Sequence, residues 1–188
     1  MSDFTVIGER RLADAGFMSF DELTVAAPDG ETFTRAIVRH CGAVAVVPLL
    51  DDNTVVCVRQ FRVALGHDLL EIVAGRQDIP GEPPEVAAQR ELAEEIGMRA
   101  GRLVPLTDFY SGPGFTDELL RVFLALDLEP DGSADRDGHE EQYMRIEHVP
   151  LANVPELIAT GALTDAKSII GMLLTQAYLD GAYEGARG

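Results

Sequence analysis

Basic side chains are scarce in this chain. Its 188 residues include 15 lysines and arginines against 32 aspartates and glutamates, which leaves a formal charge of −17. So strong a negative charge argues against binding to the phosphate backbone of nucleic acids or to anionic lipid surfaces. A small anionic substrate stays compatible with it, because a bound divalent cation can reverse the local field. We therefore expect a small-molecule partner, with no nucleic acid and no membrane.

Long hydrophobic runs and cysteine pairs are missing as well. No stretch approaches the roughly 20 apolar residues of a membrane-spanning helix, and the longest run, residues 43–50, has the length of a strand. The amino terminus, MSDFTVIGERR, carries charges ahead of any apolar block, unlike a secretory signal. Cys41 and Cys57 form no CxxC motif, and we interpret them as buried thiols, with one disulfide left as the alternative. Together these features predict a cytoplasmic protein.

The length and composition favour one globular domain with a small appendage. Apolar residues make up 46% of the chain and charged residues 25%, close to the average for folded proteins. Residues 4–40 are β-rich, with strands expected at 17–27 and 32–40 around a Pro-Asp-Gly turn. We therefore expect a small β-rich subdomain, residues 1–40, followed by a main domain, residues 41–188.

The main domain mixes strands and helices and so predicts an α/β layered fold. The apolar runs 43–50 and 54–61 are separated by an Asp-Asp-Asn turn, which predicts a hairpin inside a covered sheet. Further strands are expected at 69–73, 103–110, 119–126 and 142–149, and helices at 84–96, 154–159 and 166–179.

The helix expected at 84–96 carries a cluster of acids. Helical geometry places Glu91 and Glu95 one turn apart on one face, with Glu94 beside them and an apolar stripe next to them. Like charges at this spacing repel, and a divalent cation bound between them would remove the repulsion. Oxygen ligands of this kind suit Mg²⁺ or Mn²⁺. Arg90 can pair with Glu94, four residues further on, and steady the array. The alternative is a solvated acidic face.

This helix and the loop before it resemble the Nudix box. The fixed positions are met by Gly75, Glu82, Arg90-Glu91-Leu92, Glu94-Glu95 and Gly97-Met98. One departure exists, since six residues rather than five separate Gly75 from Glu82. The resemblance implies a Nudix-type α/β/α sandwich around a mixed β-sheet, with the small N-terminal β-rich subdomain added to it. It also implies a hydrolase that cleaves a nucleoside diphosphate linked to another group, with Mg²⁺ or Mn²⁺ as cofactor.

The resemblance further implies a role for each acid. Glu91 and Glu95 are expected to be the principal metal ligands, and Glu82 and Glu94 to support or orient them. In some relatives the carbonyl of the residue before the first glycine is also a ligand, which here is Ala74.

Two flanking segments resemble the ADP-ribose pyrophosphatase branch of the family. The segment 110–118 carries Pro113 at 15 residues past Met98, the position of that branch's marker proline. It implies a loop that lines the nucleotide pocket, with Pro113, Gly114, Phe115 and Glu118 as substrate-binding residues; the alternative is a Gly/Pro turn. Upstream, Arg59-Gln60-Phe61-Arg62 implies a pyrophosphate clamp, for which Arg62 is the stronger candidate, against surface charges flanking a strand.

In this branch the catalytic base comes from a loop outside the box. The acidic segment 138–142 occupies the corresponding place, and either Glu140 or Glu141 could take a proton from water. His139 could hydrogen-bond a carboxylate there, and no histidine shows metal-ligand spacing. Residues 1–40 fit the N-terminal extension that this branch exchanges across a homodimer.

The activity expected from these resemblances is Mg²⁺-dependent hydrolysis of ADP-ribose to AMP and ribose 5-phosphate. Another nucleoside-diphosphate sugar, such as GDP-mannose, is the first alternative, because the box contacts only the pyrophosphate. A Nudix module that binds a nucleotide without cleaving it is the second, although the complete set of box glutamates argues against it.

Overall fold

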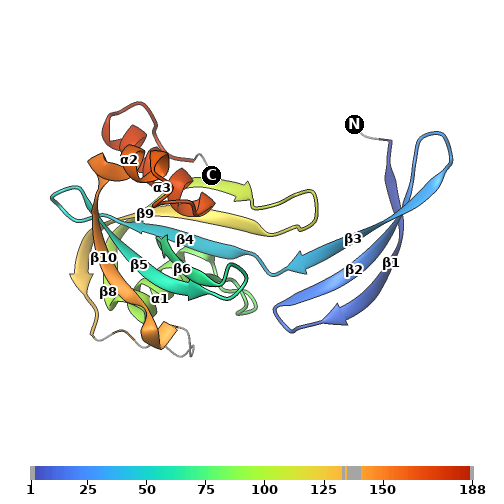
Figure 1. Cartoon of the computed structure of the whole chain (residues 1–188), viewed down its shortest axis with the longest axis horizontal. Coiled ribbons are helices and arrows are strands. Elements are labelled where there is room, and N and C mark those ends of the chain that lie inside the picture. The colour runs from blue at the N-terminus through green and yellow to red at the C-terminus, as the bar shows by residue number, and fades with distance from the viewer. Residues whose placement is uncertain (1–2, 133, 135–140, 187–188) are drawn as a thin grey trace. The chain divides into compact units, whose positions relative to one another are not determined.

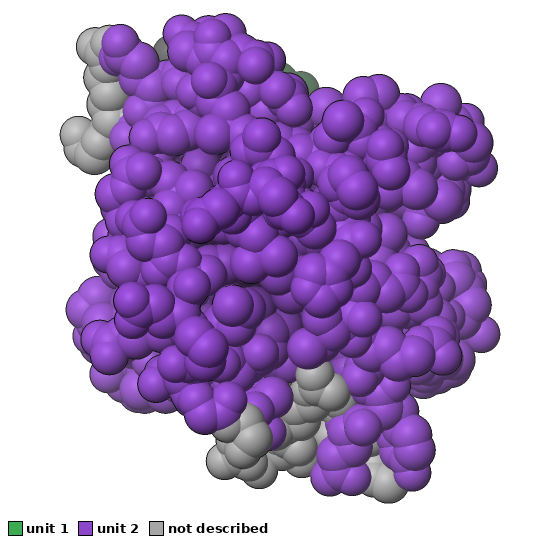
Figure 2. All heavy atoms as spheres, turned by 90° about the vertical axis from the view of Figure 1, so that its left-hand side faces the viewer, with its two compact units in different colours: residues 1–42, 110–119 green, residues 43–109, 120–188 purple. Residues whose placement is uncertain are grey.

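The computed structural model describes residues 3–132, 134 and 141–186. The chain divides into two compact units: unit 1 comprises Met1–Gly42 with Tyr110–Leu119, and unit 2 comprises Ala43–Phe109 with Leu120–Gly188 (Figure 2). None of the helices in the described part of the chain has the length and apolarity that a bilayer span requires.

Unit 1 is built on a three-stranded antiparallel sheet in the order β1-β2-β3. Its strands are β1 (Thr5–Asp14), β2 (Met18–Ala26) and β3 (Thr32–His40). The expected turn lies between β2 and β3, where Gly30 adopts a φ of 88° and its N–H donates to the carbonyl of Ala27. The sequence pattern does not predict β1 as a separate strand, because its residues are exposed along almost their whole length and show no inside–outside alternation.

Within its described residues, unit 2 contains two sheets and three α-helices (Figure 1). The four-stranded sheet has the order β7-β4-β9-β8, in which β4 runs parallel to β9 and antiparallel to β7, so the sheet is mixed. The three-stranded sheet has the order β10-β5-β6. The bounds of these elements are β4 (Ala43–Pro48), β5 (Thr54–Arg62), β6 (His67–Glu71), β7 (Val73–Arg76), α1 (Pro84–Ile96), β8 (Met98–Tyr110), β9 (Leu119–Pro130), η1 (Glu141–Tyr143), β10 (Arg145–Pro150), η2 (Leu151–Asn153), α2 (Val154–Ala159) and α3 (Ala166–Leu179).

Helices cover both faces of the strands in unit 2, which gives the α/β/α layering that the sequence predicts (Figure 1). Strand side chains alternate between the two faces. Ala45 and Val47 of β4 therefore join the apolar cluster under α2 and α3, whereas Val44 and Val46 join the cluster under α1. All residues of β4 are buried, as expected for a strand between two helical layers.

The predicted hairpin of residues 43–50 and 54–61 is wrong. Strands β4 and β5 lie in different sheets and share one isolated bridge, between Leu49 and Val55. Both strands are apolar on both faces, so each takes the centre of its own sheet, paired with strands from distant parts of the chain.

The strand predicted at 69–73 is divided between the two sheets. Strand β6 ends at Glu71, β7 begins at Val73, and Ile72 passes between them. The N–H of Ile72 donates to Oγ of Ser168, at 2.8 Å, in the first turn of α3. The chain therefore crosses from one sheet to the other within one residue, fixed by a side chain of the covering helix.

The cysteine prediction is half correct. Cys57 is buried, and burial raises the pKa of its thiol to about 12, which makes it unreactive. Cys41 is exposed, contrary to the prediction, because it follows the end of β3 rather than lying inside a strand. Both cysteines are described, and no disulfide links them.

Candidate active site

Helix α1 positions the acidic cluster and has the bounds that the sequence predicts. Pro84 stands in its first turn, where the missing N–H costs nothing, and Gly97 ends the helix in the left-handed conformation at φ 64°. One face of the helix packs in the apolar core through Ala87, Ala88, Leu92 and Ile96. The carboxylates therefore emerge from the neighbouring face, close to β7.

Three of the predicted metal-site carboxylates converge on one guanidinium, that of Arg90. Its Nη1 donates to Glu91 at 2.6 Å and to Glu94 at 3.1 Å, while Nε and Nη2 donate to the two oxygens of Glu82, each at 3.1 Å. The predicted pair of Arg90 with Glu94 is confirmed. Hydrogen bonding to Glu82, with the charges of Glu91 and Glu94, raises the pKa of Arg90 against the opposing effect of burial.

Gly75 of β7 lies directly against the carboxylate of Glu91. A Cβ added at Gly75 would stand 1.9 Å from both Cδ and Oε1 of Glu91. Only a residue without a side chain leaves room for this carboxylate, so Gly75 is required for its close approach rather than for an unusual φ. The extra residue in the loop before α1 thus leaves Gly75 in contact with the acid. Ala74, the carbonyl candidate, precedes it in β7 and is half-buried.

Glu95 is 6% exposed. The pKa of Arg62 is raised first by hydrogen bonding to Glu71 and then by the charges of Glu71 and Glu95. Arg62 ends β5, and its Nε and Nη2 donate to the two oxygens of Glu71, each at 2.6 Å. Arg59, by contrast, donates to Glu147 of β10, from Nε at 2.5 Å and from Nη2 at 3.1 Å. The two arginines of the predicted clamp therefore have separate partners, and Arg62 is the one within electrostatic range of the acidic face of α1.

The acidic cluster has the donor chemistry of a divalent-cation site. In the described part of the chain, no group of three or more His, Cys, Asp and Glu side chains stands in metal-coordinating geometry. The point on which Glu82, Glu91 and Glu94 converge is taken by the guanidinium of Arg90. All the groups offered are carboxylates, and oxygen donors of this kind fit Mg²⁺ or Mn²⁺ better than zinc. The missing side chain at Gly75 supplies the space that the Glu91 carboxylate needs.

The predicted nucleotide loop belongs to unit 1 and is described there by itself. The N–H groups of Phe115 and Thr116 both donate to the carbonyl of Gly112, at 3.0 Å, which forms a tight turn through Pro113 and Gly114. Phe115 is 62% exposed, as a residue available to a ligand would be. Glu118 is already engaged, because its Oε2 accepts a hydrogen bond from Ser111 at 2.5 Å.

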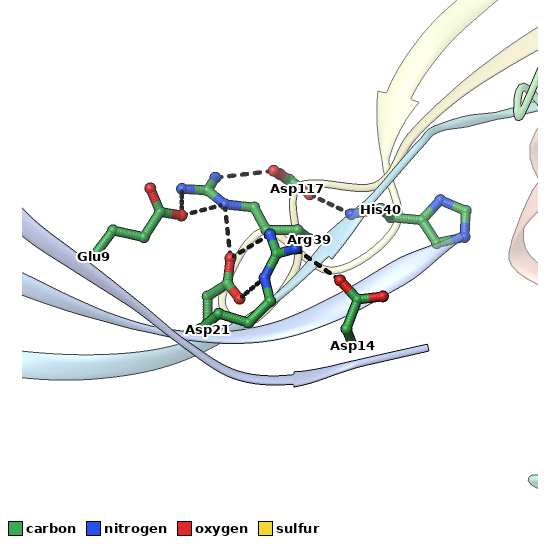
Figure 3. A network of polar contacts seen from close by, with 7 residues as sticks. Glu9, Asp14, Asp21, Arg39, His40 and Asp117 are labelled. Atoms are coloured by element: carbon green, nitrogen blue, oxygen red, sulfur yellow. Dashed lines mark hydrogen bonds and ion pairs between the residues drawn. The ribbon is translucent and has the colours of Figure 1, made fainter. Parts of the chain in front are cut away.

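An ion-pair network in unit 1 fastens this loop to β3 (Figure 3). Arg39 donates to Asp117 at 2.9 Å, and the other oxygen of Asp117 accepts from the backbone N–H of His40 at 2.9 Å. The buried Asp21 of β2 accepts from Arg11 of β1 at 2.9 Å and lies 4.0 Å from Arg39 (Figure 3). The network therefore connects all three strands to the loop.

The structure does not describe the side chain of either candidate for the catalytic base. Glu140 and His139 lie outside the described residues, and Glu141 is described only as the first residue of η1. The sequence reasoning also missed Glu71, which accepts the hydrogen bonds of Arg62, and Lys167, which donates to Glu71. The one available signal was Glu71 itself, a single acid inside the apolar run 69–73.

Comparisons with known proteins agree with this geometry. The NUDIX domain family matches residues 39–169. ADP-ribose pyrophosphatase of Mycobacterium tuberculosis (strain ATCC 25618 / H37Rv) is 35% identical over 179 residues, which cover 95% of this chain and 86% of that protein. ADP-ribose pyrophosphatase of Bacillus subtilis (strain 168) is 39% identical over 144 residues, 77% of each chain. GDP-mannose pyrophosphatase of Escherichia coli (strain SMS-3-5 / SECEC) is 29% identical over 177 residues, 88% of this chain and 91% of that protein.

A solved structure supports the fold independently. The crystal structure of an ADP compounds hydrolase superposes with a TM-score of 0.83 at 23% sequence identity, and the match covers 96% of each chain. The predicted α/β fold is thereby confirmed. The domain match, the relatives and the acidic helix all agree: the chain belongs to the Nudix hydrolase family.

Proposed function

We propose that this protein hydrolyses the pyrophosphate bond of ADP-ribose to give AMP and ribose 5-phosphate. The observation that carries the proposal is the convergence of Glu82, Glu91 and Glu94 beside Gly75. Arg62 of β5 lies within electrostatic range of Glu95, which belongs to the same helix as Glu91 and Glu94. The similarity to two ADP-ribose pyrophosphatases over most of the chain supports ADP-ribose as the substrate.

Glu91 and Glu95 would hold the divalent cation, with Glu82, Glu94 and the carbonyl of Ala74 supporting it. A bound Mg²⁺ or Mn²⁺ offsets the charge of the diphosphate and lowers the pKa of a coordinated water. Water oxygen forms the new bond to phosphorus while the bond from phosphorus to the bridging oxygen breaks. Either Glu140 or Glu141 would take the proton from that water.

Arginine and loop residues would bind the rest of the substrate. The planar guanidinium of Arg62 suits two phosphate oxygens at once. Arg59 is the weaker candidate because it pairs with Glu147 of β10, whereas Arg62 lies within electrostatic range of Glu95. Pro113, Gly114, Phe115 and Glu118 would line the nucleoside pocket. The exposed ring of Phe115 favours this role, since it offers a flat apolar face for a base.

The test is a panel of nucleoside-diphosphate sugars assayed for nucleotide release. With Mg²⁺ we expect AMP from ADP-ribose, with kcat/KM at least about tenfold above that for GDP-mannose, and suppression of release by EDTA at least about tenfold. Faster GMP release from GDP-mannose would favour the second candidate, which the similarity to a GDP-mannose pyrophosphatase supports. Tight binding of ADP-ribose without AMP release would contradict hydrolysis altogether.

A homodimer formed through the N-terminal segment, residues 1–40, in the cytoplasm completes the proposal. Strand β1 is exposed along almost its whole length, and the sheet of unit 1 exposes several large apolar side chains: Phe4, Val6, Ile7, Leu12 and Phe20. Exposed apolar side chains in this number favour burial against another chain, and a second copy of this one is the simplest partner. Light scattering should give the mass of a dimer, and Ile7→Glu should shift it toward the monomer. A monomeric wild type at all concentrations would exclude the homodimer.

A further inference from the structure

A buried carboxylate lies behind Arg62, at the end of strand β6. Glu71 is fully buried and accepts hydrogen bonds on both oxygens from Arg62. Its Oε2 also accepts a hydrogen bond from Nζ of Lys167, a residue of α3 that is itself 9% exposed. Burial opposes ionisation of Glu71, but hydrogen bonding from Arg62 and the charge of Lys167 outweigh it, so the pKa of Glu71 is lowered.

The first turn of α3 fixes this carboxylate in place. Asp165 caps the helix: its Oδ2 accepts a hydrogen bond from the N–H of Ser168 at 3.0 Å and forms an ion pair with Nζ of Lys167, also at 3.0 Å. Oγ of Ser168 in turn accepts from the N–H of Ile72, the residue after Glu71. Two independent contacts, Lys167 to Glu71 and Ser168 to Ile72, thus hold the end of β6 against the helix. Glu71 has little freedom to move.

Arg62 presents the edge of its guanidinium formed by Nε and Nη2 to Glu71. Among the described residues, Glu71 is the only one to which Arg62 donates a hydrogen bond, and it uses Nε and Nη2. The donors on Nη1 are therefore available to a ligand. The side chain of Arg62 is 40% exposed, whereas that of Glu71 is 1% exposed. The buried acid thus anchors an arginine whose outer part reaches solvent.

We propose that Glu71 is a positioning residue that fixes the guanidinium of Arg62 for binding to the substrate diphosphate, and that Lys167 holds Glu71 for this task. The inference rests on the proposed function of the site. A bidentate pair fixes both the place and the plane of a guanidinium, and a second cation on the same carboxylate oxygen means that Arg62 does not neutralise Glu71 alone. An arginine held in this way binds phosphate oxygens without first losing the freedom of its side chain.

The variant Glu71→Gln tests the role directly. An amide keeps the size of the side chain but offers one acceptor oxygen instead of two, so the bidentate pair is lost. We expect KM for ADP-ribose to rise about tenfold, with kcat changed less than about threefold. Asp68→Asn is the matched control, since Asp68 lies on the same strand in an exposed ion pair with Arg145, at 2.9 Å. It should leave both constants unchanged.

A double-mutant cycle separates positioning from general structural support. In an Arg62→Met background, Glu71→Gln should raise KM no further, because the residue through which it acts is gone. An equal rise in KM in both backgrounds would overturn the proposal. If Glu71→Gln alone fails to fold, Glu71→Gln/Lys167→Met removes one charge of each sign and takes its place in the cycle.

A readout that needs no turnover keeps the two proposals distinguishable. The Nε–H of Arg62 can be followed by ¹⁵N nuclear magnetic resonance and assigned by its loss in Arg62→Met. We expect a sharp, slowly exchanging signal in the wild type and a broadened one in Glu71→Gln, while Asp68→Asn leaves it unchanged. Should the wild type release no AMP with Mg²⁺, the proposed function fails, and this signal still decides whether Glu71 fixes the guanidinium; an identical signal in Glu71→Gln would show that it does not.

Discussion

Glu95→Gln is expected to lower kcat for ADP-ribose by about a thousandfold, the largest effect that we predict. The substitution keeps the shape of the side chain but removes its charge and one oxygen of a carboxylate that we propose to bind the cation. Loss of a metal ligand of this kind removes about 4 kcal/mol of transition-state stabilisation, which corresponds to that factor in rate. Because Glu95 is 6% exposed, no solvent-exposed acid can readily take its place. The measurement is AMP release with saturating Mg²⁺.

The same helix supplies the control for this prediction. Glu85 lies in the first turn of α1 and is exposed, so Glu85→Gln makes the same chemical change away from the cluster. It should leave kcat unchanged. Nearly full turnover in Glu95→Gln, with the fold intact by circular dichroism, would show that the metal-ligand assignment is wrong.

Gly75→Ala is expected to lower kcat at least about a hundredfold while leaving the protein folded. The new methyl group would stand 1.9 Å from Oε1 and 2.2 Å from Oε2 of Glu91, so the carboxylate must leave its present position. The displaced atoms are the far end of a flexible side chain, which can turn away without moving the backbone. We therefore expect the substitution to displace Glu91, the proposed metal ligand, rather than to unfold the protein. A shift of about 1 Å is enough for a hundredfold loss of kcat.

Two measurements check this separation of activity from stability. Urea unfolding should show a loss of no more than about 1–3 kcal/mol, the usual cost of an extra methyl group in a packed site. Gly8→Ala is the control, because its added Cβ would meet only ordinary contacts, at 3.5 Å from Thr24. A folded Gly75→Ala variant with wild-type kcat would mean that Glu91 need not occupy this position.

Local features of the site could be predicted from the sequence because their signals lie within a few residues. The prolines at the start of α1, the left-handed Gly97 at its end and the spacing of its acids fix the helix and its acidic face. The pair of Arg90 with Glu94 spans one helical turn and follows from the same geometry.

Pairing between distant segments could not be predicted in this way. Strands β4 and β5 both contain apolar runs, and nothing in either run indicates that β4 pairs with β9 while β5 pairs with β10. The pattern could therefore not reveal that adjacent strands lie in different sheets. The same holds for Lys167 and Glu71, which are 96 residues apart in the chain. Arg62 could be named as the stronger candidate for a pyrophosphate clamp, but its partner Glu71 could not be named.

The crossover at Ile72 has a consequence for the whole site. Glu71, which anchors the arginine, and Gly75, which admits the acid, are separated by a few residues on either side of the step between sheets. This short piece of backbone is nearly inextensible, and it therefore fixes the distance between Arg62, which we propose to bind the diphosphate, and Glu91, which we propose to bind the cation. An insertion between Glu71 and Gly75 would therefore change the distance between Arg62 and Glu91. The longer loop before α1 can change its length without changing that distance.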